Sequence, residues 1–140
     1  MLSTTLIMVV LGGGYSLSAH SLGNALRASQ RSHALALAQS QVEFIKAAAI
    51  ADPLRVNFAN TYQTATTYCI DPNGQRVDAD QSSGLCNPYD DPGGDNFYKI
   101  GVKYDGVPGG SGAFTITAQW QNGSEAGIIN SLQLNYRLPS

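Results

Sequence analysis

Residues 34–46 read ALALAQSQVEFIK, and their apolar side chains recur at the spacing of a helix. Successive residues of an α-helix lie about 100° apart around its axis, which gives this segment two apolar faces. The first face holds Leu35, Ala38, Val42, Ile45 and Ala49, and the second, about 110° away, holds Leu37, Phe44 and Ala48. Such a helix has two surfaces to bury, and these can be covered by its own domain and by neighbouring copies of the chain. Burial of the whole helix in a single core is the alternative.

The helical pattern extends beyond this segment in both directions. Residues 19–51 contain no proline and a single glycine, and they are rich in residues of high helix propensity. Asp52-Pro53 is expected to end the helix, because the residue before proline is disfavoured in the α region and proline lacks an N–H. We therefore predict one helix from near Leu2 to near Ala51, far longer than the usual globular helix, protruding from the domain that follows.

The first 26 residues carry no charged side chain, and Arg27 is the first charged residue. As a helix the segment would be about 39 Å long, which exceeds the roughly 30 Å hydrocarbon core of a bilayer. It could serve as a cleaved signal peptide, a membrane anchor, or an apolar helix that is later buried in a protein assembly. No Lys or Arg precedes the apolar run, which counts against a signal peptide. The residues expected to build the core of an assembly are Leu6, Ile7, Met8, Val9, Val10, Leu11, Leu17, Leu22 and Leu26.

Three glycines, Gly12, Gly13 and Gly14, interrupt the apolar segment. Each is expected to cost about 1 kcal/mol of helix stability relative to alanine, while the missing side chain allows close approach of another helix. We therefore expect helix flexibility here, with a thinned, bent or locally unwound stretch over residues 12–18. The alternative is an unbroken helix with a packing face of small residues.

The C-terminal part of the chain is predicted to form an antiparallel sheet. Segments near 97–104, 113–120 and 129–138 alternate apolar and polar side chains, and glycine-containing turns separate them at 105–110 and 122–123. The shared apolar face holds Tyr98, Ile100, Val102, Tyr104, Phe114, Ile116, Ala118, Trp120, Leu132, Leu134, Tyr136 and Leu138. This face needs a cover, and the long helix supplies one, so we predict an α+β fold with a small antiparallel sheet.

Residues 54–96 carry weaker signals. Residues 62–70 are a candidate short strand, and the rest of the segment is expected to be loop, with turns indicated at Asp71-Pro72-Asn73-Gly74 and Asp91-Pro92-Gly93-Gly94. The chain has two cysteines, Cys69 and Cys86. A zinc site would need more ligands at closer spacing, so a disulfide is favoured over two separate buried thiols. A disulfide across this loop would stabilise the fold by about 3 kcal/mol and would indicate an oxidising compartment.

The order of these elements resembles that of type IV pilins and of the pilin-like proteins of type II secretion (pseudopilins). Thr5-Leu6-Ile7-Met8-Val9 resembles the start of a mature pilin, and residues 34–46 resemble the alanine-rich helix of bacterial pilin-like proteins. The likeness covers roughly residues 1–52, and the β domain is similar only in general plan. The family's usual glutamate at the fifth mature position has no counterpart, because no acidic residue precedes Glu43.

The resemblance implies three regions: an apolar helix for the membrane or filament core (1–26), its amphipathic continuation (27–52) and a β-rich head with a disulfide-bounded loop (53–140). It implies a structural subunit of an extracellular, cell-surface filament like a type IV pilus, used in adhesion, twitching motility or DNA uptake. The filament would be a helical homopolymer built by packing of the apolar helices, which lie in the inner membrane before assembly. A minor pilin or pseudopilin of a type II secretion machine, or a membrane-anchored surface binding module, is the alternative.

Charge and motifs exclude several other functions. The net charge is -2, with 8 basic and 10 acidic residues, and this balance argues against a nucleic-acid partner. No catalytic constellation, cofactor motif or metal-ligand spacing is recognisable, so we expect no enzymatic activity, cofactor, metal site or small-molecule substrate. Solvated turn acids are favoured over a calcium site for the acidic residues of the loops, which are Asp71, Asp78, Asp80, Asp90, Asp91 and Asp95.

Overall fold

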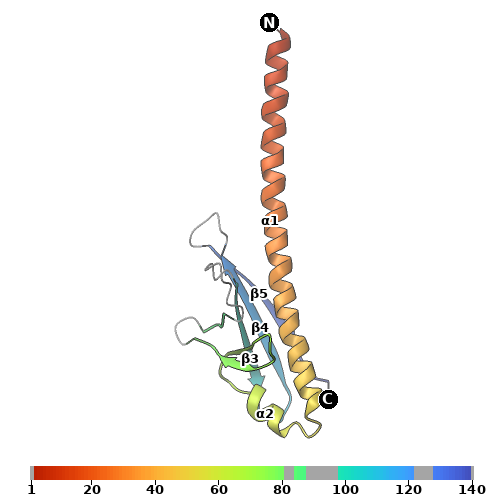
Figure 1. Cartoon of the computed structure of the whole chain (residues 1–140), viewed down its shortest axis with the longest axis vertical. Helices are drawn as coiled ribbons and strands as arrows, with labels where there is room; N and C mark the ends of the chain where they lie inside the picture. The colour runs from red at the N-terminus through yellow and green to blue at the C-terminus, as the bar shows by residue number, and fades with distance from the viewer. Residues whose placement is uncertain (1, 81–83, 88–97, 122–127, 140) are drawn as a thin grey trace. The chain divides into compact units, whose positions relative to one another are not determined.

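The computed structural model describes residues 2–80, 84–87, 98–121 and 128–139 (Figure 1). The elements in chain order are α1 (Leu2–Ala51), α2 (Val56–Tyr62), β1 (Tyr68–Ile70), β2 (Arg76–Asp78), β3 (Tyr98–Gly106), β4 (Gly112–Gln121) and β5 (Ile129–Tyr136). The chain divides into two compact units, residues 1–33 and 34–140. The first unit is the N-terminal part of α1, and the second contains the remainder of α1, α2 and the sheet. The predicted α+β class is confirmed.

The long helix ends where the sequence predicts, at Ala51. The Asp52 carbonyl accepts a hydrogen bond from Arg55 N at 2.9 Å, and the Asp52 carboxylate accepts one from Phe58 N at 2.8 Å. Asp52 thereby closes the turn and satisfies a main-chain donor in the first turn of α2. α2 and β2 both lie in a segment expected to be loop, and that expectation is wrong there: elements of seven and three residues are too short to show a regular period.

Helix α1 continues through Gly12, Gly13 and Gly14 without a break. The local unwinding expected over residues 12–18 therefore does not occur in this structure, and the alternative of an unbroken helix describes it. Glycine lowers helix stability by about 1 kcal/mol per residue but adopts helical dihedral angles freely, so three glycines weaken the turns without forbidding them. The flexibility of the helix at these positions stays a prediction.

The five strands form one antiparallel sheet in the order β2-β1-β3-β4-β5. The meander of β3, β4 and β5 is the one predicted, and its β3–β4 turn is closed by a 2.9 Å hydrogen bond from Gly110 N to Val107 O. The short β1–β2 hairpin extends the sheet at the β3 edge. Its turn is the predicted one at Asp71–Gly74, with Gly74 N donating to Asp71 O at 2.9 Å and Gly74 at φ 80°. The strand expected within 62–70 is only Tyr68–Ile70, while the turns expected at 91–94 and 122–123 lie outside the described residues.

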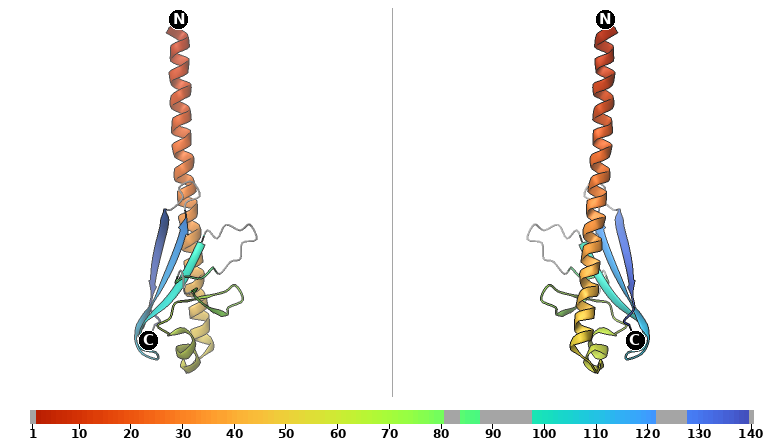
Figure 2. Two further views of the ribbon diagram at one scale, coloured as in Figure 1. Left: turned by 90° about the vertical axis from the view of Figure 1, so that its left-hand side faces the viewer. Right: turned by 90° about the vertical axis from the view of Figure 1, so that its right-hand side faces the viewer.

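One face of the sheet packs against the part of α1 from Ala34 onward, as Figure 2 shows. The fully or nearly buried residues of this core include Ala34, Ala38, Ile45, Ala49, Ile100, Val102, Tyr104, Phe114, Ile116, Ala118 and Trp120. The predicted apolar face of the sheet is therefore confirmed, as is that of the helix at Ala38, Ile45 and Ala49, whereas Leu35 is half-buried and is not among the residues of this core. The second helix face (Leu37, Phe44 and Ala48) is half-buried against the same core, so this chain already covers part of it.

Candidate functional site: the apolar helix and the disulfide-linked hairpin

All residues predicted to build a filament core lie in α1, and the structure describes the side chains of two of them. Leu22 is 70% exposed and Leu26 is 61% exposed. The residues around them in 23–29 are exposed as well, as are Arg27 and Arg31. Fully burying an exposed leucine contributes about 1.5–3 kcal/mol, so these two side chains offer unused apolar surface. Among the helical residues whose side chains the structure describes, from Leu22 onward, no segment combines the length and the mean hydropathy needed to cross a membrane.

The exposure of α1 changes at Ala34. From there on, buried residues recur every third or fourth position, at Ala34, Ala38, Gln41, Ile45 and Ala49. This spacing keeps one face of the helix on the sheet over its last turns. The sequence pattern identified Ala38, Ile45 and Ala49 but not the two other positions.

Gln41 is the polar member of this buried row. It is 0% exposed, its Nε2 donates to Ile70 O at 2.8 Å, and its Oε1 accepts from Ile70 N at 2.8 Å. A side-chain amide carries the donor and the acceptor of a peptide group, so Gln41 satisfies both main-chain groups of Ile70. This pair of hydrogen bonds ties α1 to β1. Sequence reasoning missed the role, although the position of Gln41 between Ala38 and Ile45 on the apolar face was a signal.

The predicted disulfide joins Cys69 and Cys86, whose Cα atoms lie 6.0 Å apart. Cys69 belongs to β1, and Cys86 forms an isolated bridge to Ile100 of β3, with N–H···O bonds of 2.7 and 2.9 Å. Both cysteines are buried. The bond therefore fastens the segment 84–87 and the β1–β2 hairpin to the longer strands of the sheet.

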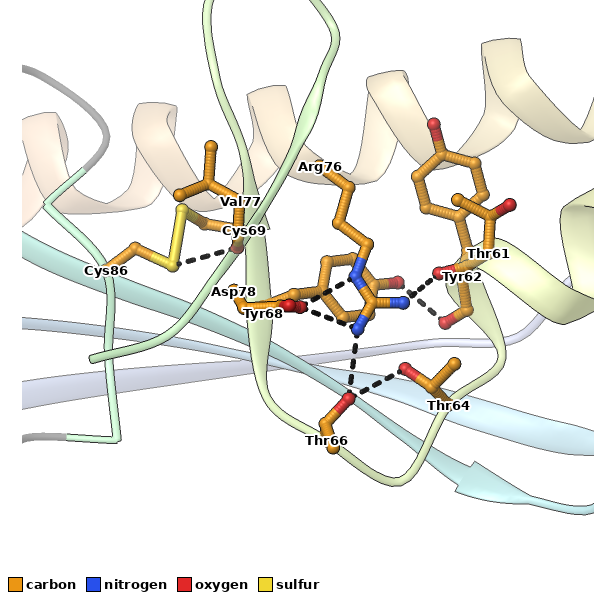
Figure 3. A network of polar contacts seen from close by, with 10 residues as sticks. All are labelled: Thr61, Tyr62, Thr64, Thr66, Tyr68, Cys69, Arg76, Val77, Asp78 and Cys86. Carbon is orange, nitrogen blue, oxygen red and sulfur yellow. Dashed lines mark hydrogen bonds and ion pairs between the residues drawn. A yellow bond between two sulfur atoms is a disulfide. The ribbon is translucent and has the colours of Figure 1, made fainter. Parts of the chain in front are cut away.

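Arg76 organises a group of polar contacts beside the disulfide (Figure 3). Its Nε and Nη2 donate to Asp78 Oδ1 at 3.1 and 2.8 Å, and Nη2 also donates to Thr66 Oγ1 at 3.0 Å. Nη1 donates to the carbonyl of Thr61. The guanidinium carbon lies 4.6 Å from the ring centroid of Tyr68, within the range of a cation–π contact. One side chain thus joins β2 to β1 and to the segment that leads into it.

Tyr68 lies beneath this guanidinium with its ring fully buried, and its Oη donates to Tyr62 O at 2.8 Å. Burial raises the pKa of Tyr68 well above its usual value, and the Arg76 cation offsets part of that rise. The hydroxyl therefore remains a hydrogen-bond donor at physiological pH. These bonded groups stabilise the hairpin, and we find no geometry among them for acid–base or nucleophilic chemistry.

Two of the loop acids, Asp71 and Asp78, make local contacts. Asp71 Oδ1 accepts from Asn73 N at 2.9 Å and from Gln75 N at 2.7 Å, as expected for a turn acid. Asp78 pairs with Arg76. Within the described ranges no three His, Cys, Asp or Glu side chains gather in a way that could hold a metal ion. Of the four other acids predicted for this region, Asp80 is described and exposed, while Asp90, Asp91 and Asp95 lie outside the described residues.

A cleft of about 600 Å³ lies at the β3–β4 turn. Arg55, Arg137 and Asp105 line it together with Gln63 and the glycine-rich segment 109–112. Gln63 Oε1 accepts from Gly109 N at 2.6 Å, and Arg55 Nη2 donates to Pro139 O at 3.2 Å. Two of the polar side chains that line the cleft therefore serve to hold the turn and the C-terminal segment in place.

Two features stand out from these observations. The first unit has exposed apolar side chains, Leu22 and Leu26, and the second unit contains the disulfide-linked β1–β2 hairpin. The first leaves apolar area exposed, and the second is fastened to the sheet by the disulfide. No protein-family model, curated protein or solved structure matches this chain.

Proposed function

We propose that this chain is the structural subunit of an extracellular filament like a type IV pilus, in which identical copies associate through their N-terminal helices. The observation that carries the proposal is the change of exposure along α1. Leu22 and Leu26 are 70% and 61% exposed, whereas the helix from Ala34 onward places a regular row of residues in the core of its own head. A leucine that its own chain leaves in water gains free energy when another copy covers it.

The composition of residues 1–26 supports association between copies. No charged side chain occurs before Arg27, so helices can pack along this segment without burying an unpaired side-chain charge. Gly12, Gly13 and Gly14 allow helix backbones to approach closely. Burial contributes about 25 cal/mol per Å² of apolar area, reduced where lipid already covers that area. Before assembly the same segment would lie in the inner membrane, with Arg27 and Arg31 near its surface.

The second unit fits the role of a displayed head. Its disulfide is suited to an oxidising, extracellular compartment, and Gln41 and Cys86 hold helix, hairpin and sheet together. The head needs no cofactor or substrate in this role, and we assign it no catalytic activity. The surface of the head would be exposed to solvent along the filament and would make the filament's contacts with other molecules.

Charged substitutions of the exposed leucines test the proposal. Leu22→Asp and Leu26→Asp should reduce the yield of sheared filaments at least tenfold, because burying an unpaired carboxylate costs several kcal/mol. Gln39→Asp is the matched control: Gln39 is exposed on the same helix, but it lies on the polar side and should leave the yield unchanged. The yield is measured against total subunit in the same cells. Filament formation by both leucine variants at the control level would contradict assembly through these helices.

A further inference from the structure

The two edges of the sheet are built differently. β2 at one edge has three residues, two of which are the ion-paired Arg76 and Asp78. β5 at the other edge has eight residues, none of them charged and none of them proline, and its register with β4 has no bulge. Natural sheets protect their edges with short strands, charges, prolines or bulges, because an unprotected edge pairs with other strands. β2 carries two of these protections, while β5 carries none along its length.

The direction of the main-chain groups of β5 follows from the hydrogen bonds of β3. Ile100 exchanges hydrogen bonds with Cys86, so its N–H and C=O point away from its register partner on β4, Ala118. Ile100 and Ala118 are therefore a non-hydrogen-bonded pair, and the main-chain groups of Ala118 point to the other side of β4, toward its register partner Leu132 of β5. Main-chain groups alternate in direction from one residue of a strand to the next. The neighbour of Leu132, Gln133, then directs its N–H and C=O away from β4.

By the same alternation, four residues present a row of donors and acceptors at the free edge: Ile129, Ser131, Gln133 and Asn135. All four side chains are exposed, and among the described residues β5 pairs with β4 alone. The apolar layer is also incomplete here, because Leu132, Leu134 and Tyr136 are only half-buried, whereas the inward residues of β4 are buried. A further strand would complete both the ladder and the apolar cover.

We propose that β5 pairs antiparallel with β5 of a second copy of this chain, which joins the two sheets across a two-fold axis. Pairing with β2 of another copy is disfavoured, because that strand is short and its Arg76 is already bonded to Asp78 and Thr66. Two β5 strands are complementary because each is uncharged, so no charge is left unpaired. The register that pairs all four outward residues places Ser131 opposite Gln133 of the other copy and brings the two Leu132 side chains together. This interface is separate from helix packing and does not rest on the proposed filament.

Sedimentation equilibrium of the full chain in a non-denaturing detergent tests the pairing. The wild-type chain is expected to form a reversible dimer whose population rises with concentration. Gln133→Lys places two cations near each other at the joined edges, and Gln133→Pro removes an outward N–H without removing a bond to β4. Each variant is expected to raise the dimer dissociation constant at least tenfold. Gln119→Lys, on the outward face of β4 inside the sheet, is the matched control and should dimerise like the wild type.

Hydrogen exchange of the wild-type chain provides a readout that does not depend on the folding of any variant. The amides of Ser131, Gln133 and Asn135 should exchange at least tenfold more slowly at concentrations where the dimer is populated. A wild-type chain that stays monomeric, or β5 amides that exchange equally fast in monomer and dimer, would overturn the proposal. So would a dimer that persists unchanged in both Gln133 variants, because the contact would then lie on another surface.

Discussion

At the scale of single residues, the head depends on a few polar side chains placed among apolar ones. Gln41 bonds both main-chain groups of Ile70 from inside the core, and Arg76 links Tyr68, Asp78 and the segment before β1. A buried main-chain group without a partner costs about 1–3 kcal/mol. Gln41 avoids this cost for both the N–H and the C=O of Ile70. Exposed ion pairs contribute less, and the Lys46–Glu43 pair is of that kind.

Replacing Gln41 by alanine should lower the free energy of unfolding by about 2–4 kcal/mol, because both main-chain groups of Ile70 lose their partner and a small void is left. Gln39→Ala is the control on the exposed side of the same helix and should change stability by less than about 0.5 kcal/mol. Urea unfolding at neutral pH measures both variants. Equal stabilities would show that the Gln41–Ile70 contact does not stabilise the head.

The alkaline stability of the protein should depend on Tyr68. Burial raises the pKa of Tyr68 in the folded state, so the folded protein holds that proton more tightly than the unfolded chain. The stabilisation from this difference is complete below the usual tyrosine pKa of about 10 and is lost as the pH rises above it. Burial shifts the pKa of Tyr98 and Tyr104 in the same direction.

Tyr68→Phe tests this dependence. At neutral pH the variant should lose about 1 kcal/mol with the hydrogen bond to the Tyr62 carbonyl. Between about pH 9.5 and 11, its free energy of unfolding should fall less steeply than that of the wild type, because one shifted tyrosine no longer titrates. Unfolding curves at intervals of half a pH unit give both slopes. Parallel slopes would mean that Tyr68 ionises as readily in the folded state as in the unfolded one.

At the scale of elements, the strength of each pattern decided what the sequence could predict. The long helix and the β3–β5 meander have regular periods over eight or more residues and were identified with their faces. α2, β1 and β2 are three to seven residues long, and tertiary contacts such as the Asp52–Phe58 bond and the disulfide position them. The role of Gln41 and the free edge of β5 were not predicted, because both depend on which elements become neighbours in space.

The disulfide should contribute measurably to the stability of the head. Replacing both cysteines by alanine should lower the free energy of unfolding by about 3 kcal/mol, since the bond closes a loop between positions 17 residues apart. The β1–β2 hairpin and the segment 84–87 should lose the most protection in hydrogen exchange, because they are what the bond fastens. A double variant as stable as the wild type would show that the disulfide does not stabilise the head and that the contacts of Arg76 and Gln41 suffice to hold the hairpin.

Substituting the glycines of α1 can distinguish their effect on helix stability from their effect on packing between helices. Gly13→Ala should increase the stability of the helix by about 1 kcal/mol, seen as higher helicity of the detergent-solubilised chain. If close approach at these glycines is needed for association, the same variant should yield fewer filaments. Gly23→Ala is the control, because an added Cβ there meets open space and Gly23 lies outside the glycine cluster. If Gly13→Ala assembled as well as the wild type, close approach of helices at Gly12–Gly14 would not be needed for association.

At the scale of the whole molecule, the chain divides into a helical unit, whose first 26 residues carry no charged side chain, and a disulfide-linked α+β head. The head was largely predictable, because its core follows from alternating strands and an amphipathic helix. The role of the first unit could not be derived in the same way, because it depends on molecules other than this chain, and it stays a proposal.

Electron microscopy of material sheared from producing cells, with mass spectrometry of the same fraction, tests the central claim most directly. If copies of this chain polymerise, the sheared fraction should contain thin filaments in which this chain is the main component and the Cys69–Cys86 peptides are disulfide-linked. Helical reconstruction should then place the α1 segments of neighbouring copies against one another along the filament axis. Recovery of the chain only in the membrane fraction, with no filament containing it, would contradict polymerisation and favour a membrane-anchored binding module.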